Sequence, residues 1–183
     1  MFLDLKDRPP AFMPSEFRIR LATESWERAS YARLRRQVFC LEQGIFQNDD
    51  RDAVDEIALP IIAVAIVIGI PDVVGTVRIH EVEPRLWWGS RLTVHRDFRR
   101  QAGLGPGLIS LAVGTAQARG CDRFLAHVQA QNVPLFERLH WRTLAPVMLH
   151  GCAHALMEAD LAHYPPCLAG ELAPPRLSAA VAA

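Results

Sequence analysis

Lysine is nearly missing from this chain of 183 residues: Lys6 is the only one, and the other basic residues are arginines. This scarcity disfavours pyridoxal and other imine-forming chemistry, which needs a reactive lysine amine. Basic and acidic residues balance at 20 each, so no basic excess points to nucleic acid. The sequence therefore predicts no nucleic-acid partner.

Cysteine pairs and long apolar segments are lacking as well. The four cysteines are scattered and form no Cys-x-x-Cys motif, which is typical of reduced thiols in a cytoplasmic protein. The apolar stretch Ile57–Ile70 is too short for a membrane span and includes Pro60, so it is interpreted as a buried strand. No charged and apolar leader opens the chain, and we expect cytoplasmic localisation with no membrane partner.

Composition and proline placement predict one domain with two extensions. Half of the residues are apolar, which favours a globular chain over a disordered one. Prolines and the lack of periodicity near both ends predict an N-terminal extension at 1–17 and a C-terminal tail at 165–183. The compact domain is then expected at 18–164.

Periodicity predicts a mixed α/β fold, in which antiparallel hairpins flank one strand–helix–strand crossover. Helices are expected to begin at Thr23, Pro106 and Asn132. Trp87 and Trp88 should point to opposite faces of one strand, so at least one belongs to the core. Strands are expected at Phe17–Leu21, Ile61–Ile68, Val73–Val82, Trp87–Val94, Phe124–Val128, Thr143–Leu149 and Ala153–Leu161.

The first of these helices should carry one apolar face. Thr23 is a favourable N-cap, and acidic residues follow in the first turn. Trp26, Ala29, Leu34 and Val38 recur at helical spacing, which predicts that they pack against the sheet. The polar, acidic stretch at 47–55 is expected to be a loop.

The glycine-rich segment at 99–108 reads Arg-Arg-Gln-Ala-Gly-Leu-Gly-Pro-Gly-Leu, between an expected strand and an expected helix. Glycines let the backbone approach a ligand closely, and the free N–H groups of a helix start favour phosphate. A Walker loop would end in Gly-Lys-Ser/Thr, and a dinucleotide fingerprint would carry a glycine at Leu108, so neither motif fits. A coenzyme A site is the alternative that remains.

The segment at 91–141 resembles the GNAT superfamily of acetyl-CoA-dependent N-acyltransferases. Arg-Leu-Thr-Val followed by Arg-x-x-Gly-x-Gly is similar to its cofactor motif, and Phe124–Asn132 followed by Leu135–Trp141 is similar to its second conserved block. The resemblance implies a mixed, mostly antiparallel central sheet flanked by helices. It also implies direct acetyl transfer, in a ternary complex, from acetyl-CoA to a primary amine of a small molecule, with a homodimer left open.

A finer resemblance lies at Leu34–Gln43, with acidic residues after it. This segment is similar to the corresponding segment of a bacterial GNAT group encoded in nitrogen-starvation gene clusters. It is more distantly similar to acyl-homoserine-lactone synthases. An acyltransferase with a longer acyl donor is therefore an alternative.

The GNAT resemblance implies roles for individual residues. Backbone groups of Leu92 and Val94 would pair with the pantetheine arm, and Asn132 and Phe136 would lie near its thiol end. The family arginine matches Arg99 or, with better spacing, Arg100. The loop residues expected to bind the cofactor, mostly through N–H groups facing the pyrophosphate, are Arg99, Arg100, Gln101, Gly103, Leu104, Gly105 and Gly107.

One departure from the family pattern concerns the acid of the reaction. Many members carry a tyrosine, which protonates the departing thiolate, where this chain has Phe136. Phenylalanine cannot donate a proton. A non-catalytic acyl-CoA-binding or regulatory module is therefore a further alternative.

The general base and the acceptor site are less defined by the sequence. Glu81, at the end of a central hairpin, and His127, in mid-strand, are the candidate bases, each with a purely structural alternative. Glu42, Asp52 and Asp55 could attract a cationic amine, and Arg91 could bind a substrate carboxylate or form a surface ion pair. The histidines flanking Cys152 alternate with it, but a fourth ligand is not evident and no metal site is predicted.

Overall fold

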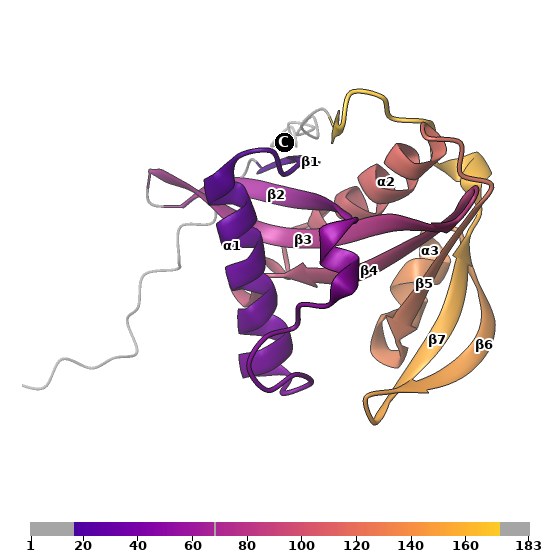
Figure 1. The fold of residues 1–183 in the computed structure, drawn as a ribbon, viewed down its shortest axis with the longest axis horizontal. Coiled ribbons are helices and arrows are strands. Elements are labelled where there is room, and N and C mark those ends of the chain that lie inside the picture. Colours follow the sequence, from indigo (N-terminus) through magenta and orange to yellow (C-terminus); the bar gives the residue numbers. More distant parts are fainter. Residues whose placement is uncertain (1–16, 68, 173–183) are drawn as a thin grey trace, which may run out of the picture.

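The computed structural model describes residues 17–67 and 69–172, in which a single eight-stranded sheet forms the framework (Figure 1). The strand order is β6-β7-β5-β4-β3-β2-β1-β8, and β4–β5 is the only parallel pair within the described residues. The predicted mixed, mostly antiparallel sheet is confirmed. The strands are β1 (Phe17–Leu21), β2 (Leu59–Val67), β3 (Ile70–Glu83), β4 (Leu86–Val94), β5 (Arg123–Gln129), β6 (Trp141–Leu149), β7 (Cys152–Ala159) and β8 (Glu171–Leu172).

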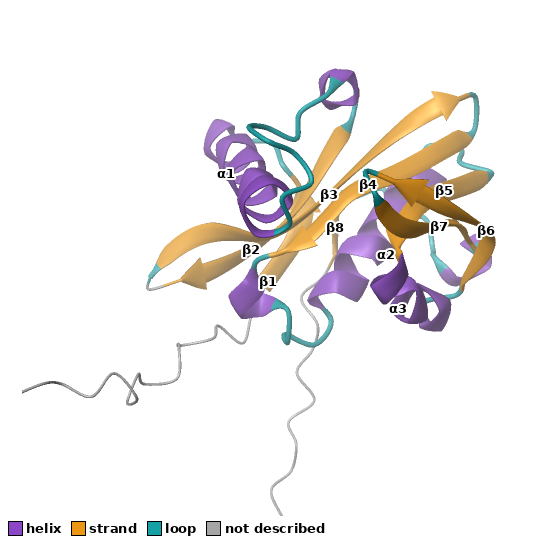
Figure 2. Cartoon of the chain, turned by 90° about the horizontal axis from the view of Figure 1, so that it is seen from below, coloured by secondary structure: helices purple, strands orange, loops and turns teal. Residues whose placement is uncertain are grey.

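Helices cover both faces of the sheet, with α1 on one side and α2 and α3 on the other (Figure 2). The larger core lies under α2, where Leu108 and Leu111 are fully buried against Ile61 and Ile79 of the sheet. The helical segments are α1 (Ser25–Arg36), α2 (Leu104–Gln117) and α3 (Val133–Arg138), with the π-helical turn η1 (Gln37–Glu42) and the 3₁₀ turns η2 (Ala53–Glu56), η3 (Arg96–Phe98), η4 (Ala130–Asn132) and η5 (Leu161–His163).

Strands β4 and β5 pair along only half of their length. Their register runs from Leu86 opposite Arg123 to Gly89 opposite Ala126 and then stops. Beyond that point β4 continues beside β3 alone, with an irregular register where Arg91 adopts a φ of +55°. Since β5, β7 and β6 turn away from β4 there, the sheet opens in its middle (Figure 1).

The buried face of α1 differs from the predicted one. Leu34 and Val38 are buried as expected, but Trp26 is 40% exposed and Ala29 is also exposed. The residues that face the sheet are largely polar: Glu27, Ser30, Tyr31 and Arg35. The N-cap is Glu24 rather than Thr23, because the buried Glu27 carboxylate accepts the backbone N–H groups of both residues.

The ends of the expected domain also need adjustment. Residues 165–172, assigned to the C-terminal tail, return to the sheet, where β8 pairs with β1 through Ile19 opposite Leu172. The Cys167 N–H donates to the Gly114 carbonyl of α2 at 2.9 Å. The remainder of both predicted extensions, 1–16 and 173–183, lies outside the described residues, as does residue 68.

Candidate functional site

A cavity of about 870 Å³ lies where β4 and β5 separate. Its walls come from η1 and the loop after it, the open half of β4, the loop before α2, the end of β5, the α3 region and the β6–β7 turn. Of the predicted cofactor residues, all but Leu104 and Gly107 line this cavity. The structure therefore brings most of the predicted site together from segments far apart in the sequence.

The N-terminus of α2 opens into this cavity. Gly103 is the N-cap and has a φ of +83°, a conformation that favours glycine. A Cβ built on Gly105 would meet no atom within 4 Å, so the space beside the first helical turn is open. The helix begins at Leu104 rather than Pro106, and the proline is tolerated because the first-turn N–H groups have no intrahelical partner.

Three loop residues need correction. The Gln101 N–H already donates to the Phe98 carbonyl at 2.9 Å, and the Gly107 N–H donates to the Gly103 carbonyl at 2.8 Å. Leu104 is 1% exposed and belongs to the core. The amides that stay candidates for a pyrophosphate are those of Arg100, Gly103 and Gly105.

Arg99 is held at the mouth of the cavity by two contacts. Its Nε donates to the Val94 carbonyl at 3.1 Å, and its Nη2 donates to the Glu42 carboxylate at 2.5 Å. Glu42 itself does not line the cavity. Among the described residues Arg100 forms no ion pair with a carboxylate, so it is the freer of the two arginines beside the loop.

The inner end of the cavity, on the α2 side of the sheet, is apolar. Phe136 is 6% exposed, and its ring packs edge-on against Trp141 at 5.0 Å between centroids. Trp141 is fixed in turn by Phe124 at 5.7 Å and by a 3.0 Å hydrogen bond from its Nε1 to the Tyr164 hydroxyl. Ile109 and Ala112 of α2 complete this wall, and Asn132 lies at its edge.

His127 lines the cavity from the opposite face. The neighbouring β5 residues Phe124 and Ala126 belong to the core under α2, so strand alternation places His127 on the α1 side. Its ring lies 4.8 Å from that of Trp88, which confirms that Trp87 and Trp88 point to opposite faces. Burial, and then the nearby His154, lower the pKa of His127 below its ordinary value, so the neutral imidazole is favoured.

The other candidate base, Glu81, lies elsewhere. Its carboxylate accepts the backbone N–H of Arg85 at 2.7 Å in the β3–β4 turn, and it does not line the cavity. The structure thus brings His127 to the cavity and leaves Glu81 outside it.

Three arginines and three aspartates form an ion-pair network next to the cavity, on the α1 side of the sheet. Arg35 binds Asp50 at 2.8 Å and also Asp55, whereas Arg78 binds both carboxylate oxygens of Asp52 at 2.7 Å. Arg91 joins the two halves through Asp50 at 2.9 Å and Asp52 at 3.2 Å. With three charges of each sign, the network is neutral.

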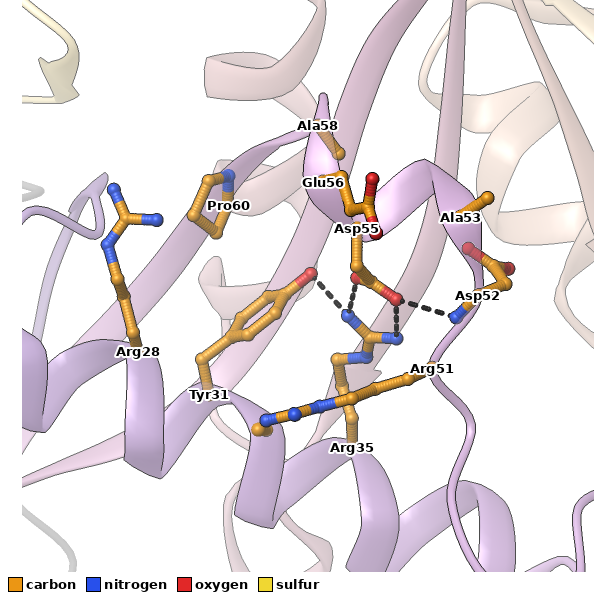
Figure 3. A pocket seen from close by; sticks show the side chains of 11 residues that line it. Arg28, Tyr31, Arg35, Arg51, Asp52, Ala53, Asp55, Glu56, Ala58 and Pro60 are labelled. Carbon is orange, nitrogen blue, oxygen red and sulfur yellow. Dashed lines mark hydrogen bonds and ion pairs between the residues drawn. The ribbon is translucent and has the colours of Figure 1, made fainter.

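The network also separates two cavities. Arg35, Asp55 and the Tyr31 hydroxyl face a second cavity of about 660 Å³ between α1 and η2, where Asp52 also contributes (Figure 3). The arginine hydrogen bonds lower the pKa of Asp52, so this carboxylate stays ionised. Asp55, predicted to attract a cationic amine, is instead bound by Arg35 and Arg78.

Sequence reasoning missed Arg35, Asp50 and Arg78 as members of one cluster. The sequence gives only part of the evidence for this cluster. Arg78 interrupts an apolar strand, which is visible in the sequence, whereas the place of Arg35 on the buried face of α1 is seen only in the structure. A charged residue within an apolar strand pattern predicts a buried partner, but it does not identify that partner.

The opened sheet, the free start of α2 and the cavity that passes between two strands define an acyltransferase of the acyl-CoA-dependent kind. Residues 18–141 match the model of the Acetyltransferase (GNAT) family, and the chain belongs to that family.

Solved structures of low sequence identity share this fold. A candidate N-acetyltransferase from Lactobacillus plantarum superposes with a TM-score of 0.68 at 21% identity, covering 79% of this chain and 98% of the other. ElaA from Escherichia coli gives 0.66 at 18% identity, with 79% and 99% covered. The CoA-dependent acyl-homoserine lactone synthase BjaI gives 0.65 at 18% identity, with 79% and 83% covered. No curated protein sequence matches the chain.

The described residues include neither a membrane-spanning helix nor a cluster of metal ligands. None of the helices there is long and apolar enough to cross a membrane. In the same part of the chain, no group of three or more histidine, cysteine, aspartate or glutamate side chains is placed to hold a metal ion.

Proposed function

We propose that this protein transfers an acetyl group from acetyl-CoA to a primary amine of a small molecule, directly and within a ternary complex. The observation that carries the proposal is one continuous cavity, which runs from the start of α2 through the opened sheet to His127. One end suits a pyrophosphate, and the other end presents a neutral imidazole. The first test is turnover of acetyl-CoA with a panel of amines.

Each proposed role follows from position. The amides of Arg100, Gly103 and Gly105 bind the pyrophosphate, and the half of β4 that does not pair with β5, with Leu92 and Val94, aligns the pantetheine. His127 accepts the proton that the amine loses as its nitrogen attacks the thioester carbonyl carbon. The C–N bond forms, the C–S bond breaks, and the thiolate takes its proton from water, because Phe136 has none to give.

Replacing the proposed base should slow the chemical step. His127→Gln keeps a polar side chain but removes the proton acceptor, so we expect kcat to fall by about 10²–10⁴-fold while the KM for acetyl-CoA changes little. Steady-state kinetics measure this. His163→Gln, in a histidine that stacks on His140 outside the cavity, should leave kcat unchanged. Equal losses in both variants would contradict the role of His127.

The pH profile gives a second readout of His127. Because its pKa is lowered, the neutral form persists below the ordinary histidine pKa of about 6.5, and activity should be lost only at a more acidic pH. In His127→Gln this acid-side step should disappear from kcat in the ternary complex. If the acid-side loss of kcat remains in His127→Gln, a group other than His127 is titrating.

A longer acyl donor is a second candidate, favoured by the apolar inner end of the cavity. Ile109, Ala112 and Phe136 offer a wall where an acyl chain could lie. The similar fold of BjaI has been solved with isopentyl-CoA. We expect kcat/KM to be highest for acetyl-CoA. If kcat/KM instead rises steadily from acetyl-CoA to a five-carbon acyl-CoA, the longer acyl-CoA is the donor and the acetyl part of the proposal is wrong.

A non-catalytic acyl-CoA-binding module is the third candidate, and Phe136 in place of a tyrosine favours it. Such a module would be protected against heat by acetyl-CoA but would acetylate no amine. Two finer assignments also belong to this proposal: membership of the nitrogen-starvation group, and action in the cytoplasm, where reduced thiols are stable.

A further inference from the structure

The part of the cavity on the α1 side of the sheet is called the acceptor chamber here. It is walled by Phe39, Phe46, Trp88, Arg91, His127 and His150, from five separate elements or loops. Phe46 and His150 meet edge-on at 5.0 Å, so the loop after η1 and the β6–β7 turn close over it. An amine that reaches His127 through the cavity lies among these residues.

The charge of this chamber is unusual for a site that would take a cationic amine. No aspartate or glutamate is among the described residues that line the cavity. Carboxylates around the chamber are bound by arginines: Glu42 by Arg99, and the three network aspartates by their three partners. The one Asp50 oxygen without a partner among the described residues is buried, and Asp50 does not line the cavity. The ionisable side chains that do face the chamber are histidines and Arg91.

The aromatic wall formed by Phe39 and Phe46 already faces one cation, the guanidinium of Arg91. The Arg91 guanidinium lies 4.7 Å from the centroid of Phe46 and 5.8 Å from that of Phe39. The Trp88 ring packs against His127. A polyamine would therefore bring further positive charge next to Arg91 without a carboxylate to balance it, which is costly in a half-buried chamber.

Arg91 keeps one donor group for a ligand. Its Nε and Nη2 bind Asp50 and Asp52, but no hydrogen bond among the described residues uses its Nη1. The side chain is 16% exposed and lines the cavity, so the two Nη1 hydrogens can reach an incoming acceptor oxygen. A carboxylate is the group that a guanidinium binds best.

We infer that the acceptor is an amine that also carries a carboxylate and an apolar body, as a hydrophobic amino acid does. The carboxylate binds Arg91 Nη1, the apolar body lies among Phe46, Ile45 and Leu149, and the amine faces His127. This inference rests on the proposed function and specifies the acceptor of the same site. It departs from the expectation that Glu42 and Asp55 select a cationic amine.

Matched acceptors test the inference on the wild-type protein. Phenylalanine and phenethylamine share one body and differ by the carboxylate, and spermidine supplies a polycation. We expect kcat/KM to be at least about tenfold higher for phenylalanine than for phenethylamine, the effect of one charge-assisted hydrogen bond, and lowest for spermidine. A preference for phenethylamine or spermidine would overturn the inference and leave the proposed acetyl transfer standing. Turnover of other amines in the panel but of none of these three would also overturn the inference, whereas no turnover of any amine, despite acetyl-CoA binding, would overturn the proposed function itself.

Two variants locate the effect. Arg91→Gln should bring the phenylalanine-to-phenethylamine ratio close to one, with circular dichroism to check that the fold survives. Leu149→Glu is independent of the ion network, because Leu149 lies at the β6–β7 turn opposite Cys152. It places a carboxylate in the chamber and should shift the preference toward spermidine by about tenfold or more. An unchanged preference in Leu149→Glu would show that the chamber does not hold the acceptor.

Discussion

Gly105→Glu should abolish coenzyme A binding while leaving the protein folded. The new Cβ points into space that is empty to 4 Å at the start of α2, where we place the pyrophosphate. Two like unit charges about 4 Å apart, at an effective dielectric of about 20, repel by about 4 kcal/mol. We therefore expect the affinity to fall by at least about 100-fold, as measured by isothermal titration calorimetry with coenzyme A.

The folded state should not suffer from this substitution. A glutamate in the first turn of a helix interacts favourably with the helix dipole, and any residue other than proline improves on glycine in helix propensity. Gly105→Ala is the matched control, because its methyl group meets no atom within 4 Å and carries no charge. It should bind coenzyme A with nearly wild-type affinity. If Gly105→Glu also binds coenzyme A with normal affinity, the pyrophosphate does not lie at the start of α2.

The backbone geometry at the proposed cofactor side could be predicted from the sequence because its determinants are local. A helix start that needs a left-handed backbone conformation favours glycine at that position, so it can be recognised from a few neighbouring residues. Gly103, with its positive φ directly before α2, is such a case. The errors there are local too: which amides are already used, at Gln101 and Gly107, depends on how the preceding turn closes. No composition or spacing argument fixes that detail.

The acceptor side could not be predicted in the same way, because its charges are balanced across long sequence separations. Asp55 looks like a free acidic residue until Arg35 and Arg78 are placed around it. The face of α1 was assigned by hydrophobicity, yet tertiary ion pairs decide it, and Trp26 is left exposed. Apolar periodicity correctly predicts the burial of Leu34 and Val38, but it misses the polar part of the buried face, where Glu27 and Arg35 lie.

The second large effect is expected from the ion network. Arg35 is 1% exposed, and its guanidinium binds Asp50, Asp55 and the Tyr31 hydroxyl. Arg35→Met keeps the volume but removes the charge, and breaking a buried ion pair in this way costs about 3–5 kcal/mol. That is a large part of the stability of a typical domain, about 5–15 kcal/mol. Urea unfolding monitored by tryptophan fluorescence measures the difference.

An exposed ion pair supplies the control for this prediction. Arg33 lies on the same helix and binds Asp72 at 2.7 Å, with the side chains 64% and 45% exposed. Arg33→Met should therefore cost no more than about 1 kcal/mol. If Arg35→Met lowered the free energy of unfolding by no more than Arg33→Met does, burial would not make the ion pairs of Arg35 more important for stability than an exposed pair. The larger loss should extend to the acceptor chamber, because Asp50 binds both Arg35 and Arg91, and one Asp50 oxygen already lacks a partner among the described residues. With Arg35 gone, Asp50 binds Arg91 alone, and the network that holds Arg91 beside the proposed acceptor position carries one net negative charge.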